Sequence, residues 1–133
     1  MSFYVEIMTP EKIFFTGEID SLVLKTIEGE MGILSNHIPM VVTVDVGTLK
    51  IKQDDEWLEA FLSEGFVEIK NNKAIILVDT AEWPHEINVN RANEAKKRAE
   101  ERLLRKLNHL EYIRSKSAVN RAIERLKVSK KDL

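Results

Sequence analysis

The sequence of 133 residues contains no cysteine, only three prolines and five glycines, and 7% aromatic residues. Without cysteine the chain can form neither a disulfide nor a thiolate metal site, which fits a reducing compartment. No apolar stretch approaches the roughly 20 residues of a membrane-spanning helix, and the start lacks the basic and apolar regions of a signal peptide. We therefore expect a soluble, cytoplasmic protein that does not itself insert into a membrane.

Arginine, glycine and proline are unevenly distributed along the chain. All seven arginines lie at or after Arg91, all five glycines lie at or before Gly65, and the last proline is Pro84. Residues 1–84 hold six lysines and 15 acidic residues, a net charge of −9, whereas residues 85–133 hold 14 basic and seven acidic residues, a net charge of +7. We therefore expect two domains, an acidic one over residues 1–84 and a basic one over residues 85–133.

Residues 1–84 consist of short apolar and β-branched runs. In Thr48–Lys52, for example, Leu49 and Ile51 face one side and the lysines face the other. Because Gly and Asn tolerate positive φ, turn signals separate several of these runs. They include Thr16-Gly17, Asp54-Asp55 and Asn71-Asn72. Short strands with a turn every 8–12 residues or so predict an antiparallel β-sandwich or barrel.

After Pro84 the apolar residues recur every three or four positions, which predicts two amphipathic helices. The first stripe holds Ala92, Ala95, Ala99, Leu103, Leu107 and Leu110, and the second holds Ile113, Val119, Ala122, Ile123 and Leu126. Asn88 or Asn90 can cap the first helix. Between the stripes lies Asn108-His109, a weak break without glycine or proline, so the tail can fold as a helical hairpin or run on as one long helix.

Four arginines are expected to converge if the tail folds as a hairpin. Arg91 and Arg98 are seven residues apart on the first helix, and Arg121 and Arg125 are four apart on the second, so each pair lies on one helix face. A hairpin folded about residues 108–111 brings the four guanidinium groups to one end. Arginine favours planar contact with carboxylate or phosphate, and a solvated basic face is the alternative.

Signals for catalysis or metal binding are weak. Glu28–Gly32 is rich in glycine but lacks the Lys-Ser/Thr of a phosphate-binding loop, so we interpret it as a tight loop between strands. His37, His85 and His109 share no metal-ligand spacing, and no acid–base pair stands out among the carboxylates. We expect a non-catalytic interaction protein without a metal site or a required cofactor.

Three segments are specific in combination: Thr26–Pro39, Gly47–Ile51 and Asp79–Glu82. In an acidic β-domain followed by a two-helix tail, they resemble the epsilon subunit family of rotary, F-type ATP synthases over essentially the full length. The resemblance implies an α+β fold with an N-terminal antiparallel β-sandwich of about ten short strands and a C-terminal two-helix antiparallel hairpin.

The resemblance also implies partners and a role. The sandwich would contact the gamma subunit and the ring of c subunits, and the ring would be met by a rotor contact loop of Gly29, Glu30, Met31, Gly32 and His37. The hairpin would extend along gamma, meet the acidic lever of the catalytic beta subunit and inhibit ATP hydrolysis. The chain would thus be a non-catalytic subunit of the central stalk, peripheral at the cytoplasmic face of the cell membrane.

Some bacterial members of this family bind ATP as a regulatory ligand through the motif Ile/Leu-Asp-x-x-Arg-Ala-x-x-Ala-x-x-Arg-Ala. Here the motif spans Ile87–Ala99, with Asn88 in place of the aspartate. The resemblance implies a nucleotide-binding set of Glu82, Ile87, Asn88, Arg91, Ala92, Arg98, Arg121 and Arg125. Asparagine still caps a helix but carries no charge, so the change bears on affinity and base preference and leaves the phosphate contacts intact.

Two other functions stay open. One is a free-standing nucleotide-sensing protein, which would use the four arginines but would not bind a gamma subunit. The other is a basic helical adaptor that binds nucleic acid. Tyr112 is the one aromatic residue after Trp83, so bases have almost no stacking platform, and the acidic domain would repel a phosphate backbone. We therefore expect no nucleic-acid partner. Co-purification with a gamma subunit distinguishes the central-stalk role from both alternatives.

Overall fold

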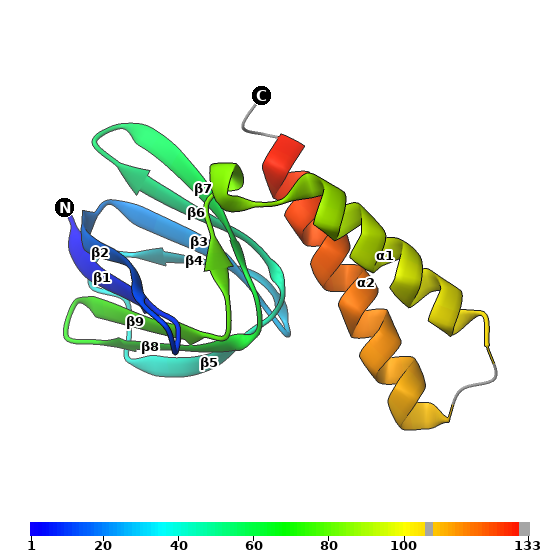
Figure 1. The fold of residues 1–133 in the computed structure, drawn as a ribbon. Coiled ribbons are helices and arrows are strands. Elements are labelled where there is room, and N and C mark those ends of the chain that lie inside the picture. The colour runs from blue at the N-terminus through cyan, green and yellow to red at the C-terminus, as the bar shows by residue number, and fades with distance from the viewer. Residues whose placement is uncertain (106–107, 131–133) are drawn as a thin grey trace. The chain divides into compact units, whose positions relative to one another are not determined.

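The computed structural model describes residues 1–105 and 108–130. The chain divides into two compact units, Met1–Trp83 and Pro84–Leu133. The first unit is a ten-stranded sheet folded into a sandwich (Figure 1). Its strands are β1 (Phe3–Met8), β2 (Ile13–Ile19), β3 (Ser21–Thr26), β4 (Gly29–Leu34), β5 (Met40–Val44), β6 (Gly47–Gln53), β7 (Glu56–Leu62), β8 (Gly65–Lys70), β9 (Lys73–Val78) and β10 (Ala81–Glu82). The second unit is helical, so the predicted α+β fold is confirmed.

The strands pair in the order β10-β7-β6-β3-β5-β8-β9-β1-β2, and β4 pairs with β3 beside this path. The sheet nearly closes, since Gln53 Nε2 on β6 donates a hydrogen bond of 2.9 Å to the carbonyl oxygen of Glu18 on β2. Among the described strands, β1 and β9 are the one parallel pair, with Val5 opposite Ala74. This pair departs from the antiparallel prediction. A hairpin would force two strands to run in opposite directions, but β1 and β9 are far apart in the chain and are not joined by one.

Alternating apolar residues build the core of the sandwich. Phe3, Val5 and Ile7 of β1 are buried, and so are Leu49 and Ile51 of β6, which confirms the prediction that Leu49 and Ile51 share one face. The residues between them are less buried, so each strand contributes one face to the core. Burying a side chain of this size stabilises a protein by about 1.5–3 kcal/mol, and most strands contribute at least two of them.

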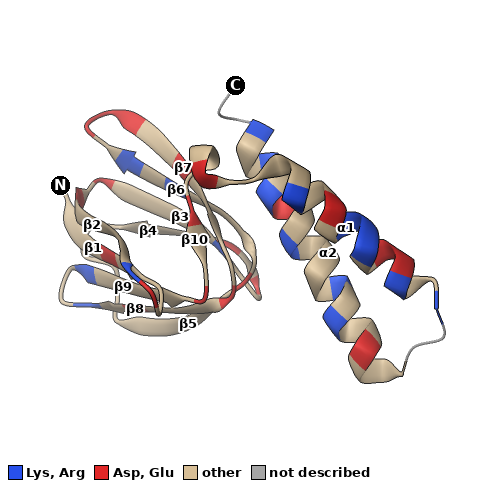
Figure 2. Ribbon diagram, viewed as in Figure 1, with Lys and Arg blue, Asp and Glu red and all other residues tan. Residues whose placement is uncertain are grey.

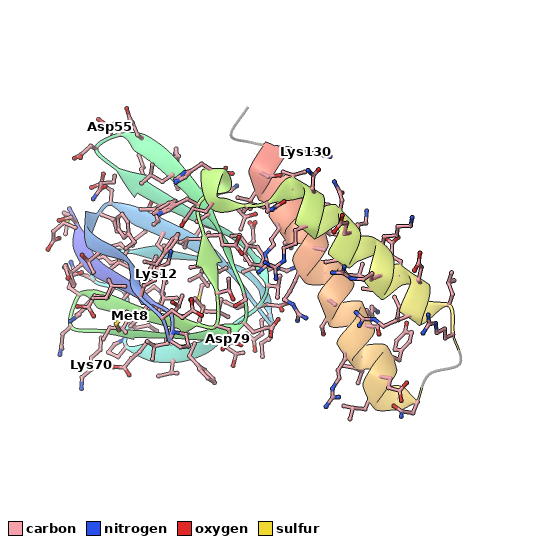
Figure 3. The ribbon with its side chains drawn as sticks, viewed as in Figure 1. Met8, Lys12, Asp55, Lys70, Asp79 and Lys130 are labelled. Atoms are coloured by element: carbon pink, nitrogen blue, oxygen red, sulfur yellow. The ribbon has the colours of Figure 1, made fainter. Side chains whose placement is uncertain are left out.

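Two of the predicted turns close tight hairpins. In the Asp54-Asp55 pair φ is 52° and 62°, and in the Asn71-Asn72 pair it is 52° and 57°, as in type I′ turns. Asp55 lies at the tip of the β6–β7 hairpin (Figure 3). The predicted turn at Thr16-Gly17 is wrong, because both residues lie within β2. Glycine is compatible with a strand as well as a turn, and β1 reaches β2 through Thr9–Lys12 instead.

The helical unit begins with a single 3-10 turn, η1 (Pro84–Glu86), followed by α1 (Val89–Leu103) and α2 (His109–Lys130). Asn88 Oδ1 accepts a hydrogen bond of 3.0 Å from Arg91 N, so the predicted cap by Asn88 is confirmed. Asn108 Oδ1 accepts one of 2.8 Å from Glu111 N, and its amide donates one of 2.7 Å to Glu111 Oε1. These bonds begin α2 as a separate helix, which runs back antiparallel beside α1 (Figure 1).

Small residues are buried along the helices. They are Ala92 and Ala99 on α1 and Ser115, Ala122 and Val128 on α2. A spacing of seven residues keeps Ala92 and Ala99 on one face of α1, and Ser115 and Ala122 on one face of α2. An antiparallel register that sets Ala99 level with Ala122 also places Ala92 beside the last turns of α2. We infer that these faces form the contact between the helices, where small side chains permit close approach.

Leu110 and Ile113, two apolar residues predicted near the connection between the helices, are not part of the buried helix contact. α1 ends at Leu103, so the first stripe does not continue along one helix to Leu110 as predicted. Leu110 and Ile113 lie on α2 and are 55% and 46% exposed, and Leu107 lies outside the described residues. Because α2 begins anew at the Asn108 cap, the residues after it do not continue the helical spacing of α1.

Gly65 begins β8 against the backbone of β9. A Cβ at this position would overlap the carbonyl oxygen of Leu77, whereas a Cβ at Gly32 on β4 would meet no atom within 4 Å. We expect Gly65→Ala to lower the free energy of unfolding by about 1–3 kcal/mol, since the backbone must shift. The control, Gly32→Ala, should change it little. Urea unfolding measures both, and equal stabilities would contradict this packing.

Candidate functional site

The predicted binding residues belong to both units. The rotor contact residues lie in the sandwich, and the nucleotide-binding arginines lie in the helical unit. Glu82, also assigned to the nucleotide, lies in β10 of the sandwich, is half-buried and stands opposite Phe61 of β7. Acidic residues are common on the strands, and basic residues recur along both helices (Figure 2).

Three of the four predicted arginines directly precede a buried alanine: Arg91, Arg98 and Arg121. Each residue of an α-helix is turned by about 100° from the one before it, and the sense of this turn reverses between antiparallel helices viewed along one direction. Residues that precede the contact positions on either helix therefore turn to the same side of the hairpin. Arg125, one turn after Arg121, lies on that side too.

The same helix geometry places two more arginines on this side of the hairpin. Arg102 follows Ala99 by three residues, as Arg125 follows Ala122, and Arg114 directly precedes Ser115. We call the whole set the arginine face; it comprises Arg91, Arg98, Arg102, Arg114, Arg121 and Arg125. The four predicted arginines form the part of this face farthest from the connection between the helices, where one extended anion can meet both helices.

The remaining residues predicted to bind nucleotide surround the start of α1. Ile87 is 8% exposed and Ala92 is 5% exposed, so both side chains are buried. Asn88 is exposed and uses its Oδ1 to cap α1. It therefore fills the capping role that the aspartate of the family motif would fill, without its charge.

The predicted rotor contact loop is largely a strand. Gly29, Glu30, Met31 and Gly32 lie in β4, which pairs with β3 along its whole length. The turn is Ile27-Glu28, so the interpretation of Glu28–Gly32 as a tight loop is wrong for Gly29–Gly32, which lie in a strand. Gly29 has a φ of 117°, which favours glycine. The glycine therefore marks the exit from the turn and not its tip.

His37 lies beyond the other end of β4 from this turn. The five residue steps from Gly29 to Leu34 span about 17 Å at 3.4 Å per residue, so the structure does not gather the predicted residues into one loop. His37 is half-buried, and its Nδ1 lies 2.8 Å from the carbonyl oxygen of Ile38. Exposed apolar residues flank both ends, since Ile27, Leu34 and Ile38 are 68%, 63% and 70% exposed.

An apolar row crosses the outer face of the sandwich and was not predicted from the sequence. The strand registers place Thr43, Phe66, Leu77, Met8 and Ile13 side by side across β5, β8, β9, β1 and β2. Phe66, Leu77 and Ile13 are 57%, 51% and 66% exposed. The sequence feature that could have revealed this row is the apolar run on β9. Consecutive strand residues face opposite sides of the sheet, so some of these apolar side chains must face outward.

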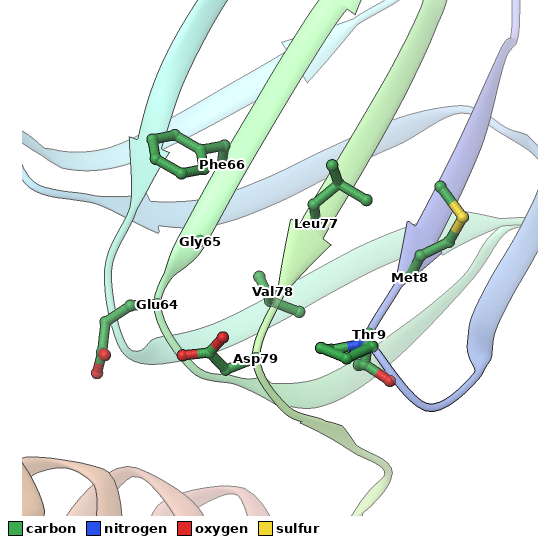
Figure 4. A pocket seen from close by; sticks show the side chains of 9 residues that line it. Met8, Thr9, Glu64, Gly65, Phe66, Leu77, Val78 and Asp79 are labelled. Atoms are coloured by element: carbon green, nitrogen blue, oxygen red, sulfur yellow. The ribbon is translucent and has the colours of Figure 1, made fainter.

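A pocket of about 350 Å³ lies along this row. Phe66 and Leu77 line it together with Met8 and Thr9 (Figure 4). Glu64 and Asp79 also belong to its lining, and the N–H of Asp79 donates a hydrogen bond of 3.2 Å to the carbonyl oxygen of Glu64. The pocket therefore combines an apolar floor with negative charge.

Within residues 1–105 and 108–130, no group of three or more His, Asp or Glu side chains is placed to hold a metal ion. In the same ranges, no helix combines the length and apolar character needed to cross a membrane.

The cap of α1 can be tested by substitution. Asn88→Ala removes the acceptor for Arg91 N and should destabilise α1 by about 1 kcal/mol, whereas Asn88→Asp should retain the cap and interact favourably with the helix dipole. Asn93→Ala, at an exposed position of the same helix, is the control and should not reduce helix content. Far-UV circular dichroism during heating compares the variants; a loss for Asn93→Ala as large as for Asn88→Ala would argue against a capping role.

Comparisons with known proteins cover nearly the whole chain. Residues 2–84 match the family described as ATP synthase, Delta/Epsilon chain, beta-sandwich domain, and residues 85–130 match ATP synthase, Delta/Epsilon chain, long alpha-helix domain. The ATP synthase epsilon chain of Ruminiclostridium cellulolyticum is 50% identical over 125 residues, 94% of this chain and 93% of that one. The epsilon chain of Caldicellulosiruptor bescii is 48% identical over 130 residues, 98% and 95% of the two chains.

Solved structures share the fold at low identity. A chain of the Euglena gracilis mitochondrial ATP synthase, in a structure of OSCP, F1 and c-ring, aligns with a TM-score of 0.81 and 17% identity over 92% of this chain and 78% of that chain. A chain from the central stalk and c-ring of the Tetrahymena thermophila mitochondrial ATP synthase aligns with a TM-score of 0.66 and 16% identity over 95% of each. These structures support the fold, and the family models and the curated relatives show that the chain belongs to the delta/epsilon chain family of ATP synthases, as the resemblance predicted.

Proposed function

We propose that the protein is a non-catalytic central-stalk subunit that couples the rotor of ATP synthase to its catalytic head and regulates ATP hydrolysis through its helical unit. It would act at the cytoplasmic face of the cell membrane as part of the complex. The observation that carries this proposal is the combination of an acidic sandwich bearing an apolar row with a separate basic helical hairpin, in a chain whose epsilon-chain relatives match over nearly their whole length.

We propose that the gamma subunit docks on the apolar row. Single exposed apolar residues are common on protein surfaces, but neighbouring ones across four strands, β8, β9, β1 and β2, form a patch of the kind that binds partners. The pocket beside Phe66 and Leu77 can accept an apolar side chain, and Glu64 and Asp79 favour a basic neighbour. The c ring would meet the exposed residues of β4 and the segment around His37.

Phe66→Ser and Leu77→Ser test the docking surface. Burial of either side chain is worth about 1.5–3 kcal/mol, so each change should weaken binding to gamma about tenfold or more. Both residues are more than half exposed, so the fold should be kept. Trp57→Ser is the control, because Trp57 is 53% exposed on β7, outside the row. Calorimetric titration with the gamma subunit measures the affinities, and equal binding by all three variants would exclude this surface.

We further propose that ATP binds the four predicted arginines of the arginine face and favours the hairpin over an extended helix that reaches the acidic lever of the beta subunit. In the hairpin Arg98 and Arg121 lie on one face. In a continuous helix the 23 residues between them would span about 35 Å at 1.5 Å per residue. A nucleotide that contacts both arginines binds the hairpin alone, so it must shift the population toward the hairpin.

ATP should therefore raise the thermal stability of the isolated protein. At 100 times its dissociation constant, a ligand that binds only the folded hairpin contributes about 2.7 kcal/mol. Arg98→Ala and Arg121→Ala should abolish this stabilisation. Arg114→Ala is the matched control, on the same face but nearer the helix connection, and should retain it. If ATP stabilised the four proteins equally, the arginines would be a solvated basic face.

Co-purification separates this function from the alternatives. A free-standing nucleotide sensor would bind ATP without accompanying a gamma subunit, and a nucleic-acid adaptor would bind neither. The central-stalk role requires that the protein purify with gamma from the cells that produce it.

A further inference from the structure

We propose that Asn72 is a positioning residue for the rotor contact. It would hold residues 35–39, the segment between β4 and β5, in the conformation that the rotor meets. The inference rests on the proposed function, in which the segment around His37 faces the rotor. Asn72 itself lies in the β8–β9 turn, more than 30 residues later in the sequence.

Asn72 connects three parts of the chain that are distant in sequence. Its Oδ1 accepts a hydrogen bond of 2.7 Å from Asn36 N, and its Nδ2 donates one of 3.0 Å to the carbonyl oxygen of Ser2. Ser35 Oγ lies 3.3 Å from both Asn72 Oδ1 and the Ser2 carbonyl oxygen, so its proton can be donated to either. One amide side chain thus fixes both the N-terminus and the start of the segment.

The turn explains how asparagine can take this position. Asn72 is the second residue of the type I′ turn, with a φ of 57°, a conformation that asparagine tolerates better than most residues. Asn71, the first residue, has a φ of 52°, and among the described residues its side chain makes no hydrogen bond. The two neighbours therefore share a backbone role, and Asn72 alone adds the side-chain contacts.

The segment depends on this support because it lies outside the strands. Asn36 has a φ of 62°, so the chain bends sharply there, and its N–H is bonded to Asn72. The next residues are the half-buried His37 and Ile38, which is 70% exposed. If the bond to Asn36 were lost, the bend would sample other conformations, and ordering it upon binding would reduce the affinity for the rotor.

Three variants distinguish the contribution of the Asn72 side chain from that of the turn backbone. Asn72→Gly keeps the positive φ and removes only the side chain. Asn72→Asp keeps an acceptor for Asn36 N and removes the donor to Ser2. Asn71→Gly is the matched control in the same turn. The probe is an ATP synthase complex from which this subunit has been removed, and its affinity for each full-length variant is measured by surface plasmon resonance.

We expect Asn72→Gly to bind the complex about fivefold to tenfold more weakly, Asn72→Asp to retain most of the affinity, and Asn71→Gly to match the wild type. Amide hydrogen exchange at Asn36 should accelerate in Asn72→Gly and not in the other two. Unchanged affinity of Asn72→Gly, or unchanged exchange at Asn36, would overturn the proposal. Failure of the wild-type protein to bind the complex would overturn the proposed function itself, and the proposal with it.

Discussion

The two-residue period of the strands is the constraint on which the rest of the sandwich depends. With Val5, Leu49 and Ile76 facing the core, their neighbours must face outward, whatever their polarity. This is why Phe66 and Leu77 are exposed although they are large and apolar, and a shift of one residue would reverse every side chain. The registers that build the core therefore also assemble the apolar row, so the proposed docking surface is a consequence of the fold.

The helical unit is held differently from the sandwich. Its buried contact residues are mostly small, with Ala92, Ala99 and Ala122 among them. Each buried methyl group contributes about 0.8 kcal/mol, so the contact between the helices is worth much less than the core of the sandwich. A ligand binding energy of a few kilocalories per mole is then comparable with the energy that holds the hairpin closed. Such a balance suits an element that changes conformation while the sandwich remains fixed to its partners.

Local signals predicted the parts of this structure that depend on few residues. Asn71-Asn72 and Asp54-Asp55 required positive φ, and Asn88 offered a cap, so these elements could be identified from short windows of sequence. Gly17 and Gly29 misled the prediction of turns, because glycine suits strand positions and turn exits as well as turn tips.

Features that depend on pairing between distant segments could not be predicted in the same way. The apolar row follows from registers among five strands, and the contacts of Asn72 join residues up to 70 positions apart. The arginine face could be predicted in part, since helical spacing fixed each pair and the antiparallel direction fixed their common side. Its extension to Arg102 and Arg114 became visible only when the buried alanines showed which helix faces meet.

The central claim, that the helical unit switches while the sandwich stays bound, is tested most directly by a distance within the assembled ATP synthase. Spin labels at positions 101 and 120, both exposed and outside the arginine face, lie nearly level in the hairpin, where helix axes are about 8–10 Å apart. In a continuous helix they would be separated by about 29 Å. The account predicts the short distance with ATP and a growing population at the long distance without it. The short distance alone under both conditions would contradict it.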